Sequence, residues 1–299
     1  MKVDSKLAKK IETGDFIVTA ECAPGATASG ATAEAALKAL GGKPVAVNVA
    51  DNSHGVALSS MAASVAAMKL GVEPVLQMVT RDRNRIALQS DLLGAASLGI
   101  RNVLCMSGYH QTLIGCPESV NVFDIDSIQF IEMTSRMSEN GVLADGTGID
   151  GPFPMLVGAA ANPFLKPLEL NLLRLGQKVE AGARFVQTHA VFDIQAFTQW
   201  LDAARKEGFT KKAAILASVY PLESVAEAQK LRDTYAEFCI PDEVIERLKK
   251  AGDAGKKEGL AICVETIKQL KALTGLCGIH ILSGGREAVV PDLIAASGL

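Results

Sequence analysis

Residues 74–106 read PVLQMVTRDRNRIALQSDLLGAASLGIRNVLCM, and this stretch decides the fold. It opens with the apolar run Pro74–Val79, which is too short for a helix and typical of a buried strand. The segment Arg85–Leu98 repeats apolar residues at helical spacing, and Gly99 follows it as a C-terminal cap. A second apolar run, Asn102–Met106, completes a strand–helix–strand unit. Two buried strands joined by a helix predict a parallel sheet.

The same alternation continues along the whole chain. Six more apolar runs are predicted to be buried parallel strands: Phe16–Ala20, Val45–Val49, Met155–Ala159, Arg184–Thr188, Ala213–Ser218 and Gly278–Leu282. Helical spacing predicts these helices between them: Ala33–Leu40, Val56–Leu70, Ser127–Asn140, Pro167–Ala181 and Ile194–Glu207. The segment 225–273 is expected to form two or three helices before the last strand. Further glycines stand just past predicted helix ends: Gly41, Gly71, Gly182 and Gly208.

Eight strand-then-helix units with no break in composition predict an α/β protein with a single closed (β/α)8 TIM barrel. We expect this barrel to occupy residues 1–299 as one domain, with residues 1–15 as an N-terminal helical extension. A doubly wound open sheet is the alternative. No G-x-G-x-x-G motif follows any predicted strand, which removes the main support for that alternative.

Composition narrows the class of partner. The chain has 30 basic and 33 acidic residues in a mixed order, and its formal net charge is −3. No basic block or aromatic–basic stripe suggests nucleic acid or an anionic membrane surface, so we expect a small molecule or another protein as partner. The start of the chain is charged and lacks the apolar core of a signal peptide, and the apolar runs are too short to span a membrane.

The six cysteines are scattered, with no paired Cys or His spacing typical of a zinc or iron–sulfur site. We therefore expect no metal bound by this chain. Free thiols fit a reducing compartment, which predicts a cytoplasmic protein.

The active site of such a barrel gathers at the carboxyl ends of the strands. The predicted strand ends supply mainly polar side chains: Glu21, Asn48, Gln77, Ser107, Tyr109, His189 and Arg286. A ring of polar groups with few acids suits a large, planar, hydrogen-bonding ligand better than a divalent metal, which would want several carboxylates.

Glu21 and His189 are the candidates for acid–base chemistry. Glu21 follows the run Phe-Ile-Val-Thr-Ala, and partial burial at the barrel rim would raise its pKa and make it a usable acid near neutral pH. The alternative is a strand-end carboxylate in a surface ion pair. His189 is interpreted as a proton donor or a ring-stacking partner, with a structural histidine as the alternative.

Two other segments also have competing interpretations. Gly108 would let a cofactor approach the backbone closely, or it simply serves a tight turn. The segment Arg81–Arg85 would cover anionic groups as a loop, or it is a capped helix start with a solvated charged face. The sequence favours the helix start.

A set of motifs, in order from about residue 15 to 299, resembles the methylenetetrahydrofolate reductase family. The matching segments are Thr19–Pro24, Arg83–Asn102, Met106–Gly108, Gly158–Pro163 and Lys178–Asp193, and Arg286 stands thirteen residues before the end as in the family. The runs VADN (49–52) and RDRNRIALQSDLLGA (81–95) are most similar to short, anaerobic-type bacterial members.

The resemblance implies a flavin, FAD or FMN, lying across the strand ends. It implies hydride transfer that reduces 5,10-methylenetetrahydrofolate to 5-methyltetrahydrofolate, with Glu21 as the general acid that protonates N10. The implied cofactor contacts are Asn48, Gln77, Ser107, Gly108, Tyr109 and Lys178, the last with the flavin phosphate. The implied folate contacts are Tyr109, His189 and Arg286. The implied electron donor is NAD(P)H or a redox partner protein, and either a homo-oligomer or a hetero-complex is compatible with the resemblance.

The chain departs from the family pattern at several of these positions. Tyr109 stands where the family has an acid, His189 where it has glutamine, and Gln77 where it usually has histidine. These departures keep two alternative functions open. One is a non-redox folate-binding or methyl-transfer barrel, and the other is a weakly active subunit of a larger electron-transfer complex.

Overall fold

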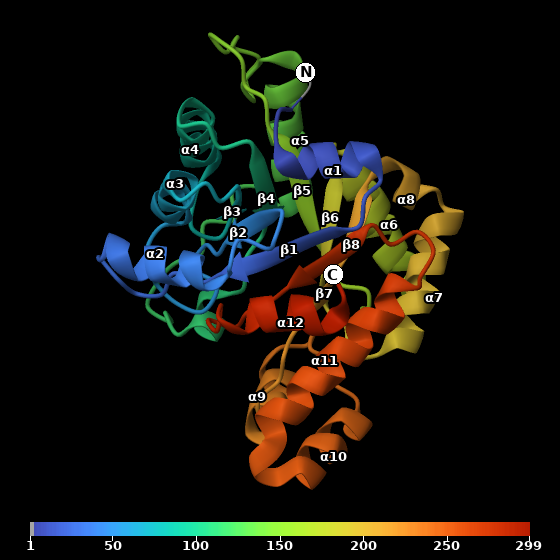
Figure 1. Cartoon of the computed structure of the whole chain (residues 1–299). Coiled ribbons are helices and arrows are strands. Elements are labelled where there is room, and N and C mark those ends of the chain that lie inside the picture. Colours follow the sequence, from blue (N-terminus) through green and yellow to red (C-terminus); the bar gives the residue numbers. More distant parts are fainter. Residues whose placement is uncertain (1–2) are drawn as a thin grey trace.

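The computed structural model describes residues 3–299, which form a closed barrel of eight parallel strands (Figure 1). Neighbouring strands pair in sequence order, and β8 pairs with β1 to close the ring. The predicted (β/α)8 barrel is confirmed, and the open-sheet alternative is wrong. The strands are β1 (Ile17–Cys22), β2 (Ala46–Val49), β3 (Pro74–Val79), β4 (Asn102–Met106), β5 (Leu156–Ala161), β6 (Phe185–Ala190), β7 (Ala214–Val219) and β8 (Gly278–Ile281).

Helices follow the strands around the outside of the barrel. They are α2 (Gly30–Ala39), α3 (Ser60–Lys69), α4 (Arg85–Ser97), α5 (Ser127–Asn140), α6 (Leu168–Glu180), α7 (Ile194–Lys206), α8 (Phe209–Lys212) and α12 (Val289–Ser297). The segment predicted to hold two or three helices contains α9 (Val225–Thr234), α10 (Asp242–Ala251) and α11 (Gly255–Lys271). Short 3-10 turns lie at Gln111–Ile114 and Gly252–Ala254. Helices α8 and α12 were not predicted.

Several strands run further toward the barrel mouth than the sequence predicted. The structure places Glu21 inside β1 and His189 inside β6, rather than just after them. Strand β1 continues because Glu21 lies beside Asn48 and Cys22 beside Val49, so β2 supplies a pairing partner for both. The two candidate residues are therefore held by rigid strands.

Helix α1 (Lys6–Thr13) closes the opposite end of the barrel. Its Leu7 is fully buried in an apolar cluster with Leu104 and Phe185 from the strands. The carboxylate of Glu73 accepts a 2.9 Å hydrogen bond from the backbone N–H of Leu7, where the positive end of the helix dipole favours a negative charge. With this end plugged, the cavity for a ligand lies at the other end, at the mouth formed by the strands' carboxyl ends.

A layer of polar side chains lies inside the barrel above this apolar plug. The amides of Asn48 and Gln187 exchange two hydrogen bonds of 2.7 and 3.0 Å. Thr19 lies 2.9 Å from Nδ1 of His280, and burial lowers the pKa of that imidazole to about 3. This layer is neutral and well satisfied, so it forms a rigid floor beneath the mouth.

The helices between β7 and β8 project beyond the barrel (Figure 1) and enclose an apolar cluster of their own, centred on Leu222, Ile245 and Leu248. The link between α9 and α10, residues 235–241, returns from this projection to the barrel mouth, and we call it the α9–α10 connector. Its Phe238 ring lies 5.7 Å from Tyr220 and 6.4 Å from Phe192. The connector therefore packs over the carboxyl ends of β6 and β7.

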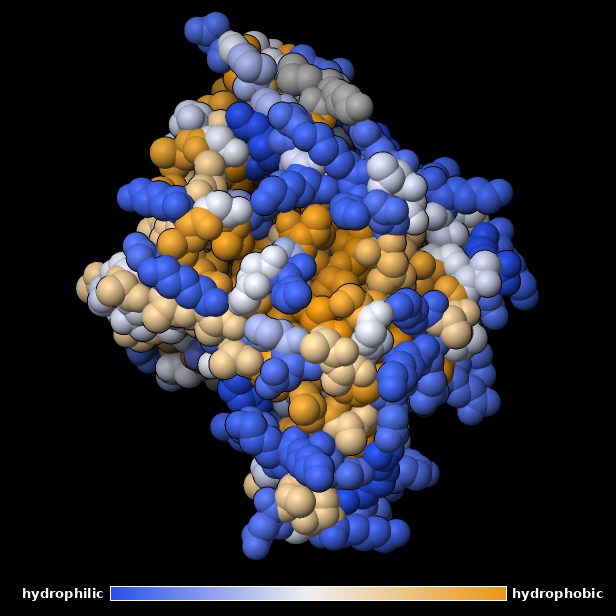
Figure 2. All heavy atoms as spheres, in the orientation of Figure 1, coloured by the Kyte–Doolittle hydropathy of each residue, from blue (hydrophilic) through white to orange (hydrophobic). Residues whose placement is uncertain are grey.

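Apolar residues are also visible on the outside of the barrel. Figure 2 shows them over β1 and β8 between α1 and α12, surrounded by hydrophilic residues. Phe16 and Val18 are partly buried there against the core, and the Lys271 ammonium lies 6.0 Å from the Phe16 ring. Within residues 3–299, no helix is long and apolar enough to cross a membrane.

Candidate active site

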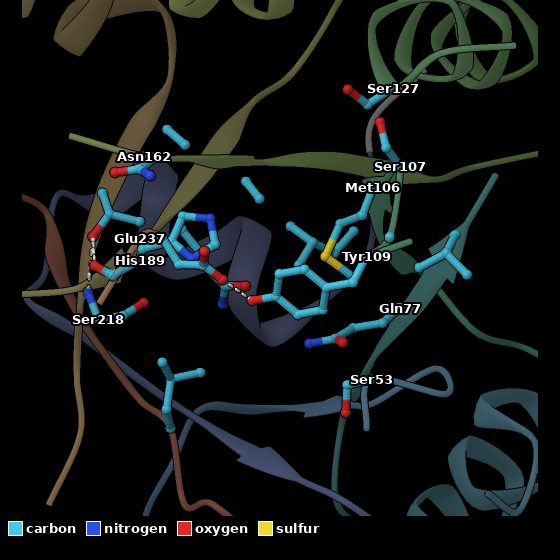
Figure 3. Close-up of a pocket in the computed structure, with 18 of the residues that line it drawn as sticks. Ser53, Gln77, Met106, Ser107, Tyr109, Ser127, Asn162, His189, Ser218 and Glu237 are labelled. Atoms are coloured by element: carbon cyan, nitrogen blue, oxygen red, sulfur yellow. Dashed lines mark hydrogen bonds between the residues drawn. The ribbon is translucent and has the colours of Figure 1, made fainter. Parts of the chain in front are cut away.

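A cavity of about 410 Å³ lies at the carboxyl ends of the barrel strands (Figure 3). Its volume is within the range of small-molecule sites, and its wall combines apolar side chains with a few polar ones. Seven of the residues predicted from the sequence line it: Glu21, Gln77, Ser107, Gly108, Tyr109, Lys178 and His189. They come from β1, β3, β6, α6 and the turn after β4, so the barrel brings together residues from most of the chain.

Two predicted residues do not line the cavity. Asn48 is fully buried in the polar layer below, where its amide is paired with Gln187. Arg286 lies behind Tyr220, with its guanidinium 5.2 Å from that ring, and it donates to the Glu227 carboxylate at 2.8 Å. Both side chains already have protein partners. Their direct contact with a ligand stays a prediction.

Glu21 extends from β1 into the cavity and is partly buried. Burial, and after it the negative charge of Glu287, raise the pKa of its carboxyl to about 7, against the opposing effect of a hydrogen bond from Gln77. Glu287 is itself held in place, because it accepts a 3.0 Å hydrogen bond from the backbone N–H of Ala23. No cation among residues 3–299 forms an ion pair with Glu21, so the surface ion-pair interpretation is wrong. Glu21 can hold a proton at neutral pH.

Tyr109 reaches from the end of β4 to a carboxylate that the sequence did not suggest. Its hydroxyl donates a hydrogen bond to Oε1 of Glu237 on the α9–α10 connector (Figure 3). Burial and the charge of Glu237 raise the pKa of Tyr109 above its usual value, so its hydroxyl remains a donor. His189 also lines the cavity, and burial lowers the pKa of its imidazole, which leaves the ring neutral at pH 7.

Lys178 and Arg174 lie together on α6 at the β5 side of the cavity. The Lys178 ammonium donates a 2.6 Å hydrogen bond to the carbonyl of Ala160. Burial and the neighbouring charge of Arg174 lower the pKa of Lys178 to about 8. In the described part of the chain, neither cation forms an ion pair with an acid. Two neighbouring cations that form no ion pair within the described residues suit an anionic group of a ligand.

The charges of the arginine-rich segment after β3 are satisfied within the protein. Asn84 caps α4 by accepting from the N–H of Ala87, as the helix-start interpretation predicted. Arg83 binds Asp51 at 2.7 Å, and Arg85 binds Asp124 at 2.8 Å. The capped helix start is confirmed, but the solvated charged face expected with it is wrong, because Arg81 is fully buried and Arg83 is paired with the buried Asp51.

Arg81 has a different position, because it is fully buried and lines the cavity. It donates to the carbonyl of Tyr109 at 3.2 Å and to the carboxylate of Asp82, so it fixes the turn after β4. Gly108 in that turn has φ +84°, and an added Cβ would lie 3.1 Å from Cβ of Val79. The tight turn alone therefore requires glycine at this position.

Among the cavity residues that sequence reasoning missed are Arg174, Glu237 and Phe238. Arg174 stands four residues before Lys178 on one helix, a spacing that places both on the same face and could have identified it. Glu237 and Phe238 gave no local signal, because the connector reaches the mouth only through the tertiary packing of α9–α11. Over residues 3–299, no group of three or more His, Cys, Asp or Glu side chains is arranged to hold a metal ion.

Comparison with known proteins agrees with the resemblance noted from the motifs. Residues 6–298 match the family described as methylenetetrahydrofolate reductase. A Caenorhabditis elegans protein described as a probable methylenetetrahydrofolate reductase (NADPH) is 25% identical over 208 residues, which are 69% of this chain and 29% of the relative. The chain thus spans less than a third of that relative's length.

Solved structures share the barrel at low sequence identity. An uncharacterized protein from Clostridium thermocellum that binds two copies of 5-methyl-5,6,7,8-tetrahydrofolic acid superposes with a TM-score of 0.65 at 13% identity, covering 98% of each chain. A 2,3-dimethylmalate lyase superposes with a TM-score of 0.52 at 13% identity, covering 99% of this chain and 85% of the lyase. These likenesses show the fold, while the family match extends over nearly the whole sequence. The chain belongs to the methylenetetrahydrofolate reductase family.

Proposed function

We propose that this protein reduces 5,10-methylenetetrahydrofolate to 5-methyltetrahydrofolate, with a bound flavin as hydride carrier and Glu21 as general acid. The observation that carries the proposal is the Glu21 carboxyl, which faces the cavity with a pKa of about 7 and has no cation partner in the described residues. Family membership supports the choice of a folate as substrate.

The polar groups of the cavity fit a flavin by their chemistry. Lys178 and Arg174 offer positive charge for a phosphate, and Gln77 and Ser107 offer hydrogen bonds at the neighbouring strand ends. The buried hydroxyl of Ser218 also lines the cavity and has no hydrogen-bond partner within residues 3–299, so it is available to a ligand. When bound, a flavin supplies the hydride.

Glu21 is suited to move one proton during the reaction. A general acid is most effective when its pKa is close to the working pH, and this condition is met near pH 7. In its protonated form Glu21 would donate to N10 of the folate, which makes that nitrogen a better leaving group and opens the five-membered ring. The hydrogen bond from Gln77 stabilises the carboxylate that remains, and the charge of Glu287 favours its reprotonation.

We expect the purified protein to show the visible absorbance of oxidised flavin, and we expect anaerobic addition of 5-methyltetrahydrofolate to bleach it. A flavin spectrum that does not bleach would remove the folate assignment and retain the cofactor. A colourless protein that binds the folate would favour the non-redox folate-binding or methyl-transfer barrel. Bleaching without turnover of an artificial acceptor would favour a weakly active subunit of a larger complex.

Replacing Lys178 with methionine is expected to weaken FMN or FAD binding by about 10- to 100-fold, because a charge-assisted hydrogen bond to a phosphate contributes about 1.5–3 kcal/mol. Methionine keeps the length and apolar stem of the side chain and removes only the charge. Titration of the apoprotein with each flavin, followed by fluorescence, measures the effect. Lys69→Met, an exposed lysine at the end of α3, is the matched control. Equal affinities for the two variants would contradict the phosphate role.

A further inference from the structure

Glu237 is a buried carboxylate with little compensation from the protein. It is 8% exposed, and no lysine or arginine among residues 3–299 forms an ion pair with it. Its Oε1 accepts a hydrogen bond from Tyr109, and no described residue donates to its Oε2. The titratable groups that interact with it electrostatically are Tyr109, His189, His54, Tyr235 and Cys239. Burying such a carboxylate costs stability unless a further donor completes its hydrogen bonds.

The side of the Glu237 carboxylate that lacks a donor faces the cavity. Glu237 and its neighbour Phe238 both line it, although they lie on the α9–α10 connector rather than on a strand. Figure 3 shows Tyr109 reaching across the cavity toward Glu237, with His189 on the same side as Glu237. The missing donor can therefore come from a bound ligand.

The surroundings of Glu237 specify the shape of that ligand. The rings of Tyr109 and Tyr235 lie 5.2 Å apart, and Phe238 lies 5.7 Å from Tyr220, so aromatic surfaces flank the carboxylate. Aromatic surfaces pack well against a flat ring. A carboxylate only accepts hydrogen bonds, and it binds most strongly to two parallel N–H donors on a planar group.

We propose that Glu237 is a specificity-determining residue that accepts the paired N–H donors on the edge of a flat heterocycle, namely the ring amide N–H and the adjacent 2-amino group of a reduced pterin. This assignment rests on the proposed function and names which part of the substrate Glu237 reads. The Tyr109 hydroxyl holds Oε1 in position, and Oε2 remains directed to the ligand. A structural latch is the competing explanation, in which the Tyr109–Glu237 hydrogen bond only fastens the connector to β4.

The test compares two ligands by calorimetric titration. One is 5-methyltetrahydrofolate, and the other is the same molecule with its 2-amino group replaced by methyl. The wild type is expected to bind the amino ligand about 10- to 100-fold more tightly, the size of one lost charge-assisted hydrogen bond. In Glu237→Gln the side-chain oxygen can still accept the hydrogen bond from the Tyr109 hydroxyl. The amide N–H group, however, replaces the Oε2 atom that accepts from the ligand. It should lose most of this preference, because it weakens the amino ligand, which has two N–H donors for Glu237, more than the methyl ligand, which keeps only the ring amide N–H.

The control variants distinguish ligand recognition by Glu237 from a structural latch that only holds the connector against β4. Glu243→Gln makes the same chemical change at an exposed position on α10 and should leave both affinities as in the wild type. Glu237→Asp keeps the carboxylate and should restore part of the preference. Equal weakening of both ligands by Glu237→Gln would establish the latch and overturn the proposal.

The wild-type protein alone also tests the proposal, even if a variant fails to fold. A wild-type protein that binds 5-methyltetrahydrofolate with no preference for the 2-amino group would refute the role of Glu237 and leave the proposed function standing. A wild-type protein that binds neither ligand would refute both.

Discussion

Replacing Glu21 with glutamine is expected to lower the rate of 5-methyltetrahydrofolate formation by about 10³-fold or more, with the flavin still bound. Glutamine has nearly the shape of glutamate and can still contact Gln77, but it has no acidic proton to give to N10. General acid catalysis contributes about 10²- to 10⁴-fold, so its loss alone accounts for an effect of this size. Steady-state turnover gives the rate, and the visible spectrum of the same sample shows that the cofactor is retained.

The pH dependence of the rate in each reaction direction shows which protonation state of Glu21 that direction requires. Glu21 is protonated below its pKa of about 7, so reduction of the methylene substrate should fall about tenfold per pH unit above 7. Oxidation of 5-methyltetrahydrofolate needs the carboxylate instead, so its rate should rise toward pH 7 and then level off. The residual activity of Glu21→Gln should show neither of these two pH dependences.

An exposed acid provides the matched control for this experiment. Glu118→Gln, in the loop after β4, should keep the wild-type rate and both pH dependences. Near-normal turnover in Glu21→Gln would refute the acid role. A lost spectrum in that variant would instead place Glu21 among the groups that hold the cofactor.

The sequence predicts β3 and β4 to the residue, because apolar runs bounded by polar segments are a local signal. The ends of other strands depend on a neighbour that the local pattern cannot show. Strand β1 continues through Glu21 because Asn48 of β2 lies beside it. The barrel rule thus predicts which strand ends surround the site, but the exact extent of each strand is decided by pairing.

The same limit applies to the candidate site. Glu21 and Lys178 could be assigned to the mouth from strand order and motif alone. Asn48 also stands at a strand end, yet its amide pairs with Gln187 in the layer below, because inward-facing positions form successive layers along the barrel. Glu237 is 128 residues from Tyr109 in sequence, and only the folding of α9–α11 brings the two together.

Replacing Gly278 with alanine is expected to destabilise the protein by more than about 3 kcal/mol, because overpacking against backbone is among the most costly core changes. Gly278 begins β8 and pairs with Ile17 of β1, where the barrel closes. An added Cβ would lie 2.1 Å from the carbonyl oxygen of Ile17 and 2.8 Å from its Cβ. No side-chain rotation can relieve a contact with a backbone oxygen, so the two strands would have to separate. Chemical denaturation measures the loss in the free energy of unfolding.

Gly94 offers the same substitution with the opposite expected sign. It lies within α4, and apart from its own chain neighbours and helix backbone no described atom is within 4 Å of the position that its Cβ would occupy. Gly94→Ala should raise the free energy of unfolding by about 0.5–1 kcal/mol, because alanine favours the helix and restricts the unfolded chain. Opposite shifts in the two variants would assign the effect at Gly278 to steric contact at the β1–β8 seam, since both changes add one methyl group. Wild-type stability in Gly278→Ala would mean that the seam can open locally without loss, and that closure of this barrel does not depend on the close approach of β8 to β1.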